Sequence, residues 1–243
     1  MTLVGSPFSV TVGQLVAERP ERGRVFERLG IDYCCGGRKL LAEACAQRGL
    51  DTAHVQALLE ASDAVPSAGT QPDWSTVPLS QLVDDIVSTH HESMRHELPR
   101  LSSLVQKVAA VHGATHAGLT DLNRIFSEFV RELILHMSKE ESLLFPWICG
   151  LEAGSAHRPR ALVPIDQPIH RMIQEHDDAG RALEAMRELT NGFTPPPDAC
   201  GTYRVMLSGL RDLEADMHTH VHKENNILFP RAVALDTGGK DHL

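Results

Sequence analysis

The stretch His136-Met-Ser-Lys-Glu140-Glu-Ser-Leu-Leu-Phe145-Pro146 returns later in the chain as His220-Val-His-Lys-Glu224-Asn-Asn-Ile-Leu-Phe229-Pro230. The histidines, glutamates and prolines are all offset by 84 positions (220 − 136, 224 − 140 and 230 − 146). On an α-helix, residues four apart lie on one face, about 6 Å apart along the axis. Each copy therefore points an imidazole and a carboxylate in the same direction, as a metal ion requires.

The apolar Leu-Phe-Pro sequence that ends each copy distinguishes this pattern from a surface ion pair. A single His-x-x-x-Glu spacing arises readily by chance among 14 histidines and 32 acidic residues. The repeated apolar tail indicates that this face of the helix is buried, and a buried carboxylate and imidazole must be paired or bind a metal. Two inward carboxylates would repel each other without cations between them, so the repeat predicts a dinuclear site bridged by Glu140 and Glu224.

Length and charge limit the classes of function. A chain of 243 residues suits one large domain, or a small domain followed by a medium one. Its net charge of −9 argues against nucleic acid and against anionic membrane surfaces as partners. No apolar stretch approaches the roughly 18 residues of a membrane span, and the N-terminus lacks the features of a signal peptide. We therefore expect a soluble, cytoplasmic protein.

Residues 1–60 are predicted to form a small helical domain. Its helix boundaries are marked by capping and breaking residues: Thr11 before a helix over 12–18, Pro20 and Gly30 around a second helix, and Asp51 or Thr52 before a last one through Glu60. Residues 61–77 are rich in small, polar and proline residues and are predicted to be a linker, with Trp74 as an anchor.

Cys34 and Cys35 lie in a glycine-bent loop that leads into a helix predicted to start near Arg38. Neighbouring Cα atoms are about 3.8 Å apart, too close for an unstrained disulfide, so we expect reduced thiols. A thiol ahead of a helix N-terminus and beside two cations should have a lowered pKa, which favours metal binding or electron exchange. The alternative is that both cysteines are small buried apolar residues.

Residues 78–243 show the periodicity of long amphipathic helices, without a strand pattern between them. The predicted helices cover Leu79 to Val111 with a kink at Pro99, Leu119 to about Ile148, Asp166 to Thr190, and a fourth capped by Asp198 and running to about Val233. Gly150 to Pro164 is predicted to be a loop, and Asn191 to Pro197 a rigid turn. The fold class is thus all-α, with an up-down-up-down four-helix bundle.

A dinuclear site in such a bundle needs ligands from all four helices, so the first and third helices must contribute as well. His91 and His176 are the candidates, because they are 85 positions apart, almost the offset of the central repeat. His112, at the end of the first helix, is equally suited to be a C-terminal helix cap or a ligand. The remaining helical histidines face other directions and are not assigned: His90, His96, His170, His218 and His222.

The donor set bears on the metal. Four or five imidazoles with two carboxylates and no thiolate favour iron or manganese over structural zinc, which prefers cysteine-rich tetrahedral sites. Spacing alone does not separate iron from manganese.

Three motifs together resemble a known family, the repair-of-iron-centres proteins of the YtfE/ScdA type. They are Asp32-Tyr-Cys34-Cys35-Gly-Gly37, the two His-x-x-x-Glu-x-x-x-Leu-Phe-Pro stretches and Thr-Pro-Pro-Pro-Asp-Ala-Cys200. The resemblance covers almost the whole chain, as an ScdA-like domain followed by a hemerythrin-like domain. It implies two non-haem iron ions, oxo- and carboxylate-bridged, with these ligands: His91, His136, Glu140, His176, His220 and Glu224, and His112 as a further candidate.

The resemblance also implies a role in repairing iron–sulfur clusters damaged by nitrosative or oxidative stress. Our leading hypothesis gives Cys34 and Cys35 a part in transferring electrons, iron or nitrosyl, with damaged iron–sulfur proteins as partners and nitric oxide or oxygen species as small ligands. Two alternatives stay open: a nitric oxide reductase that produces nitrous oxide, and an oxygen or nitric oxide sensor or store. Whether the protein is an enzyme therefore stays open too, and the N-terminal domain is a candidate surface for a homodimer.

Overall fold

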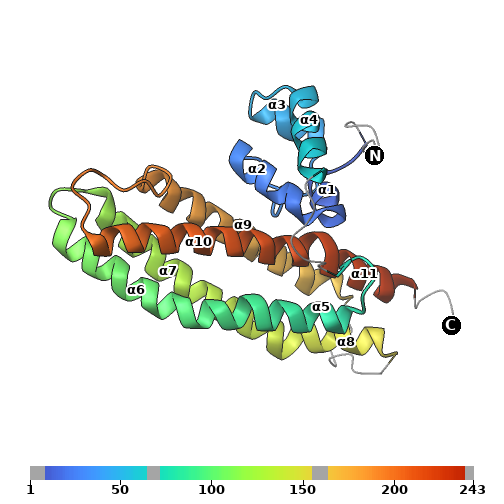
Figure 1. Ribbon diagram of the computed structural model, residues 1–243. Coiled ribbons are helices and arrows are strands. Elements are labelled where there is room, and N and C mark those ends of the chain that lie inside the picture. Colours follow the sequence, from blue (N-terminus) through green and yellow to red (C-terminus); the bar gives the residue numbers. More distant parts are fainter. Residues whose placement is uncertain (1–8, 65–71, 155–163, 239–243) are drawn as a thin grey trace. The chain divides into compact units, whose positions relative to one another are not determined.

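The computed structural model describes residues 9–64, 72–154 and 164–238. These residues are helical, apart from turns and one isolated antiparallel bridge between Thr11 and Leu40. The chain divides into two compact units, residues 1–82 with 218–243 and residues 83–217. The second boundary falls inside helix α10 (Gly201–Lys223), so one helix belongs to both units (Figure 1).

The first unit begins with four short helices: α1 (Val12–Glu18), α2 (Gly23–Leu29), α3 (Leu41–Gln47) and α4 (Thr52–Asp63), with a 3-10 turn η1 (Pro20–Arg22). Thr11 caps α1 in a capping box with Gln14, and Asp51 accepts from the first amides of α4. Gly30 ends α2 at φ 66°, where a glycine is favoured. These predicted boundaries are confirmed.

Two boundaries of this region differ from the prediction. Helix α3 starts at Leu41 and not near Arg38, because the glycine-bent loop continues to residue 40. Helix α4 runs to Asp63, beyond the predicted start of the linker. The reason is an ion pair: the Arg22 guanidinium donates to both carboxylate oxygens of Asp63 and is itself buried.

The same unit contains the end of α10, the π-helical segment η4 (Glu224–Leu228) and helix α11 (Phe229–Gly238). Trp74 packs here, as predicted for an anchor of the linker. The Lys223 ammonium lies 5.3 Å from the centroid of its ring, and Arg231 donates to the backbone carbonyls of Trp74 and Val77.

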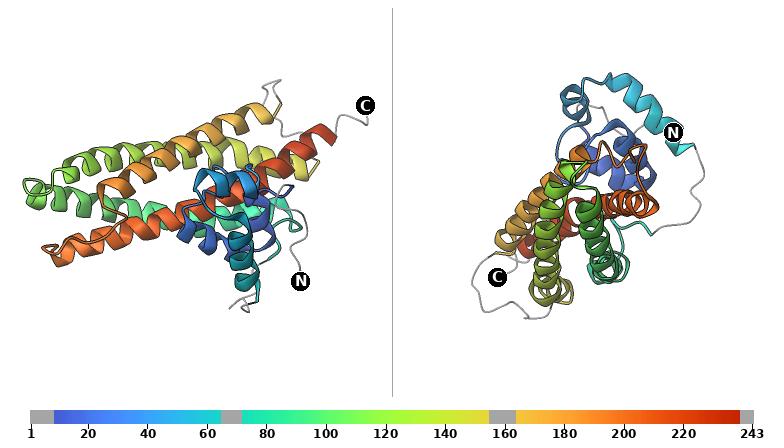
Figure 2. Two further views of the ribbon diagram at one scale, coloured as in Figure 1. Left: turned by 90° about the horizontal axis from the view of Figure 1, so that it is seen from above. Right: turned by 90° about the vertical axis from the view of Figure 1, so that its left-hand side faces the viewer.

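The second unit is a helix bundle formed by α6 (Glu92–His112), α7 (Gly118–Lys139), α9 (Asp166–Leu189) and α10 up to Met217. These helices lie side by side in both views of Figure 2. Their apolar faces meet in a core that includes Leu101, Phe126, Phe129, Leu183 and Met206. A Cβ on Gly209 would come within 2.5 Å of Leu101, so this glycine permits the close approach of α10 to α6. The predicted four-helix bundle is confirmed.

Short π-helical segments interrupt the long helices where the candidate ligands lie. They are η2 (Ile86–His91) between α5 (Leu79–Asp85) and α6, η3 (Glu140–Leu144) between α7 and α8 (Phe145–Glu152), and η4.

Pro99 lies within α6, which continues through it. Asp198 does not cap the fourth helix, which starts at Gly201; its carboxylate lies 3.0 Å from His116 Nε2.

The predicted loop from Gly150 to Pro164 starts later than expected, because α8 runs to Glu152, and its residues 155–163 lie outside the described part. No described helix is long and apolar enough to cross a membrane.

Candidate metal centre

Three imidazoles of the bundle unit face the carboxylate of Glu140, which is fully buried. Its two oxygens lie 3.2 Å from His136 Nε2, 3.5 Å from His91 Nε2 and 3.9 Å from His176 Nε2. The Nε2 atoms of His136 and His176 are only 3.0 Å apart. Nitrogen lone pairs and a carboxylate that converge in this way are the donor arrangement of a metal site.

The opposite nitrogens of two of these rings are held by carboxylates. His91 Nδ1 lies 2.6 Å from Glu141 Oε1, and His136 Nδ1 lies 2.9 Å from Glu175 Oε2. A carboxylate on Nδ1 fixes the proton there and leaves Nε2 as the donor atom that points inward.

Both orienting carboxyls are kept ionised by their neighbours. The hydrogen bond from His136 and the ammonium of Lys139 lower the pKa of Glu175 to about 2, against the opposing effect of burial. For Glu141, burial alone would raise the pKa, but hydrogen bonds and charge from His91 and Arg95 outweigh it and lower the pKa. Each therefore accepts a charge-assisted hydrogen bond at neutral pH.

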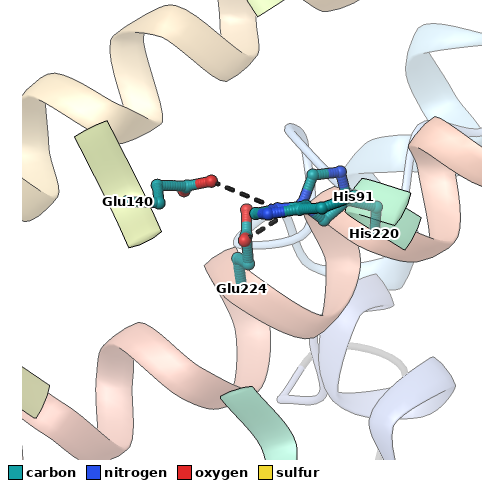
Figure 3. A group of neighbouring side chains, drawn as sticks. All are labelled: His91, Glu140, His220 and Glu224. Carbon is teal, nitrogen blue, oxygen red and sulfur yellow. Dashed lines mark hydrogen bonds and ion pairs between the residues drawn. The ribbon is translucent and has the colours of Figure 1, made fainter. Parts of the chain in front are cut away.

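The second copy of the motif has the same local geometry. His220 Nε2 lies 3.0 Å from Glu224 Oε1, and both residues are fully buried. Figure 3 draws this pair and the His91–Glu140 pair with dashed lines. Two sets of four buried residues contain the ligand types that one ion requires: His91 and His220 in one, His136 and His176 in the other, with Glu140 and Glu224 in both. Sharing of two carboxylates is typical of a binuclear metal site.

The π-helical segments coincide with three of the candidate ligands. Glu140 and Glu224 are each the first residue of such a segment, and His91 is the last residue of η2. A π-helical turn inserts one extra residue into the helix and is found mostly at functional sites, because it rotates the side chains after it.

The residues present fit a metal ion. Neither oxygen of Glu140 accepts a hydrogen bond within the described part of the chain, although both are buried. An ionised carboxylate in that situation is costly unless a cation compensates it. The imidazole and carboxylate donors are those that suit iron, manganese and zinc.

The sequence reasoning missed the residues that orient the ligands. Glu141 and Glu175 were not singled out, although each directly adjoins a candidate ligand in the chain, and that adjacency was the only signal. The sequence assigns no role to His90, yet it is buried and its Nδ1 lies 2.6 Å from Asp216 on α10.

His112 does not belong with the other candidates. It is the last residue of α6, and 21 residues separate it from His91 (112 − 91), which corresponds to about 31 Å of helix. Its Nε2 lies 3.3 Å from Cys200 Sγ. The sequence pattern could not separate the cap from the ligand, and the structure does not bring His112 together with the other candidates.

The loop that contains Cys34 and Cys35, here called the thiol loop, does not have the lowered thiol pKa that the sequence predicts. Cys34 is 6% exposed, and its pKa is raised well above the usual value, first by the hydrogen bond to Cys35, then by burial and by the negative charge of Asp32. The Asp32 carboxylate accepts from the amides of Cys34, Cys35 and Gly36. Cys35 is only partly buried, and the two sulfur atoms are 3.9 Å apart.

A cavity of about 610 Å³ borders the imidazoles of His136 and His176 between α7 and α9. Its lining mixes apolar residues with charged ones such as Glu128, Arg131 and Lys139. A diatomic molecule could therefore approach the ligand face from this side.

Comparison with known proteins agrees with this geometry. Residues 82–232 match the model of the hemerythrin HHE cation binding domain, and residues 9–63 match ScdA_N, a domain of unknown function. Iron-sulfur cluster repair protein YtfE of Citrobacter koseri is 36% identical over 223 residues, and that of Escherichia coli K12 has the same identity and length of match. The protein of that name from Pectobacterium atrosepticum is 37% identical over 228 residues. Each match covers 92% of this chain and 96% of the relative.

The matches span both the thiol loop and the two copies of the His-x-x-x-Glu motif. The chain therefore belongs to the family of YtfE-type iron–sulfur cluster repair proteins, which combine an ScdA_N domain with a hemerythrin HHE domain.

Proposed function

We propose that this chain repairs damaged iron–sulfur clusters by means of a dinuclear non-haem iron centre bridged by Glu140 and Glu224. The observation that carries the proposal is the convergence of three imidazole nitrogens on the buried carboxylate of Glu140, repeated as a His–Glu pair at His220 and Glu224. The relatives' name supplies the repair role.

In this proposal each ion has two imidazoles and two shared carboxylates as protein ligands. One set is His91, Glu140, His220 and Glu224, and the other is His136, Glu140, His176 and Glu224. Four protein ligands leave positions open on an ion that prefers six. Iron is favoured because the relatives act on iron–sulfur clusters by name and because the donor set contains no thiolate.

Iron bound at such a site would supply redox chemistry and an exchangeable ion. The protein's own residues hold and shield the ligands. Glu141 and Glu175 fix the imidazole orientations, and the Phe145 ring stacks 5.7 Å from the His91 ring and keeps water from it. The two orienting carboxylates are each 28% exposed, whereas the His91 and His136 rings behind them are buried.

The thiols are proposed to receive iron or nitrosyl in transit to a damaged client protein. The pKa of the buried Cys34 is raised, and its thiol lies 3.2 Å from Asp32 Oδ1, to which it can donate, so the less buried Cys35 is the thiol that reacts first. Nitric oxide or an oxygen species would enter by the cavity beside His136. We further propose a cytoplasmic location, because none of the five cysteines is in a disulfide and thiols stay reduced there. Dimerisation through the N-terminal domain stays a prediction.

The test is iron transfer to a dehydratase whose [4Fe–4S] cluster has lost iron. Under anaerobic conditions, with dithiothreitol in every sample to supply the electron that conversion of [3Fe–4S]+ and Fe2+ to [4Fe–4S]2+ requires, protein loaded with two ferrous ions is expected to restore the dehydratase and to lose iron in proportion. Metal-free protein should not restore it, and neither should a Cys34→Ala, Cys35→Ala double variant with full iron content. Restoration no faster than with free ferrous iron at the same concentration would contradict the proposal. Nitrous oxide formed in many turnovers per centre would instead favour the reductase.

A further inference from the structure

The two asparagines that follow Glu224 contact the thiol loop through the backbone carbonyls of Tyr33 and Cys34. Asn226 Nδ2 donates to the carbonyl oxygen of Cys34 at 3.1 Å and to that of Tyr33 at 3.2 Å. Asn225 Nδ2 lies 3.5 Å from the same Cys34 oxygen. All of these residues belong to the first unit, so the loop and the segment η4 are parts of one compact body.

The Asn226 side chain fits this position closely. A Cβ added to Gly13 or Gly37 would lie 2.4 or 2.3 Å from its Oδ1 atom, so only glycine leaves room for it on either side. Its Nδ2 also lies 3.2 Å from His222 Nδ1, one turn earlier on α10. A partly buried amide with this many partners fixes the loop in one orientation.

The first copy of the motif shows that metal binding does not need this asparagine. The residue corresponding to Asn226 is Ser142 (142 + 84 = 226). Ser142 is exposed and donates to the carbonyl of Ser138 in its own helix. The second copy has therefore acquired a side chain that reaches the thiol loop, at a position where the first copy has only a local contact.

We propose that Asn226 is a positioning residue that couples the thiol loop to Glu224, so that metal at Glu224 keeps Cys34 covered and loss of metal exposes it. This inference rests on the proposed dinuclear centre. Glu224 is fully buried at the start of a π-helical turn, and a buried carboxylate that loses its cation destabilises the turn that carries it. Asn226 is two residues further along that turn and transmits the change to the Cys34 carbonyl.

The consequence for repair is an ordered transfer. While both ions are bound, Cys34 is shielded, and the loop offers only the partly buried Cys35. Once an ion leaves, the loop opens and both thiols become available together. The thiol pair would then be presented after an ion has left Glu224, and also in protein that holds no metal.

The experiment measures alkylation of Cys34 by iodoacetamide, with mass spectrometry to follow Cys34 and Cys35 separately. Full-length wild-type protein is compared with Asn226→Asp, which keeps the shape but presents an oxygen to two carbonyls, and with Ser142→Ala as the matched control. Each is measured after loading with two ferrous ions and after removal of metal by a chelator. Asn226→Ser is a second variant, and iron content and circular dichroism report on folding.

We expect Cys34 in wild-type protein to react about tenfold faster without metal than with it, as for a local opening. Ser142→Ala should behave in the same way, whereas Asn226→Asp and Asn226→Ser should react fast in both states with their iron content retained. If the alkylation rate of Cys34 still depends on metal in both Asn226 variants, the coupling is overturned. It is also overturned if the rate in wild-type protein is the same with and without metal. A wild-type chain that takes up no iron overturns the proposed function and the coupling together.

Discussion

His136 Nδ1 lies 2.9 Å from Glu175 Oε2, so helix α9 orients a ligand that helix α7 supplies. The next residue of α9, His176, presents its own Nε2 atom 3.0 Å from that of His136. Two consecutive residues therefore serve one candidate ion in different ways. His176 offers a donor nitrogen, whereas Glu175 orients the ring of His136.

Replacement of Glu175 should weaken metal binding without removing a ligand. We expect Glu175→Ala to lower metal affinity by about 10- to 100-fold, because the His136 ring loses the carboxylate that fixes its tautomer. Competition with a chelator measures this affinity. The metal affinity of Glu175→Gln, which keeps a hydrogen-bond acceptor, should lie between those of wild type and Glu175→Ala. Glu128→Ala, an exposed carboxylate on α7, serves as control, and an equal affinity of Glu175→Ala and this control would refute the role.

Replacement of Glu140 should lower the free energy of unfolding of the metal-loaded protein but not that of the metal-free protein. Metal binding at 100 times the dissociation constant stabilises a fold by about 2.7 kcal/mol per site, and Glu140→Gln should lose most of that gain. Without metal, the same variant should be at least as stable as wild type, since it removes a buried carboxylate that accepts no hydrogen bond within the described residues. Urea unfolding with and without iron measures both. A variant destabilised equally in both states would count against a metal at Glu140.

His112→Ala should leave the metal content unchanged. The reason is distance, since His112 is at the far end of α6 from His91 and pairs with Cys200. Elemental analysis of the purified variant measures the metal content, with His91→Ala as the comparison that should lose metal. Loss of an ion from His112→Ala would restore the ligand alternative that the sequence left open.

In metal-loaded protein, Cys34 should become reactive only at high pH. Its pKa is raised above the usual value for a thiol by the hydrogen bond to Cys35 and by burial, so alkylation should stay slow at pH 7 to 9 and rise beyond. The folded chain thus keeps this proton to higher pH than the unfolded chain. The stability that this thiol contributes is therefore complete below about pH 9 and declines as pH rises further. The exposed Cys200 provides the internal reference, and a Cys34 rate that levels off near neutral pH would contradict the burial argument.

The fold and the candidate ligands could be predicted because their signals are local in the sequence. The spacing from His136 to Glu140 and from His220 to Glu224 lies within one helical turn, and the apolar tail marks the buried face. Caps such as Thr11 and Asp51 act on amides two or three residues away. The sequence alone was therefore sufficient for helix type and for most boundaries of the N-terminal unit.

The orienting contacts could not be predicted because the partners come from different helices. Glu141 reaches a ring 50 positions away, Glu175 one 39 positions away, and Asp216 one 126 positions away. The same limit explains the wrong thiol pKa. The sequence places Arg38 and Lys39 close to Cys34 in the chain, but α3 starts later than expected, and the hydrogen bond to Cys35, burial and the Asp32 charge raise the pKa of Cys34. The periodicity of apolar residues in the sequence does not indicate the π-helical turns.

The most direct test of the binuclear centre is the iron content and Mössbauer spectrum of protein purified without oxygen and then oxidised. The arrangement around Glu140 and Glu224 predicts two high-spin ferric ions per chain with antiferromagnetic coupling. A single uncoupled iron, a lone zinc, or no metal in fully supplemented protein would contradict it.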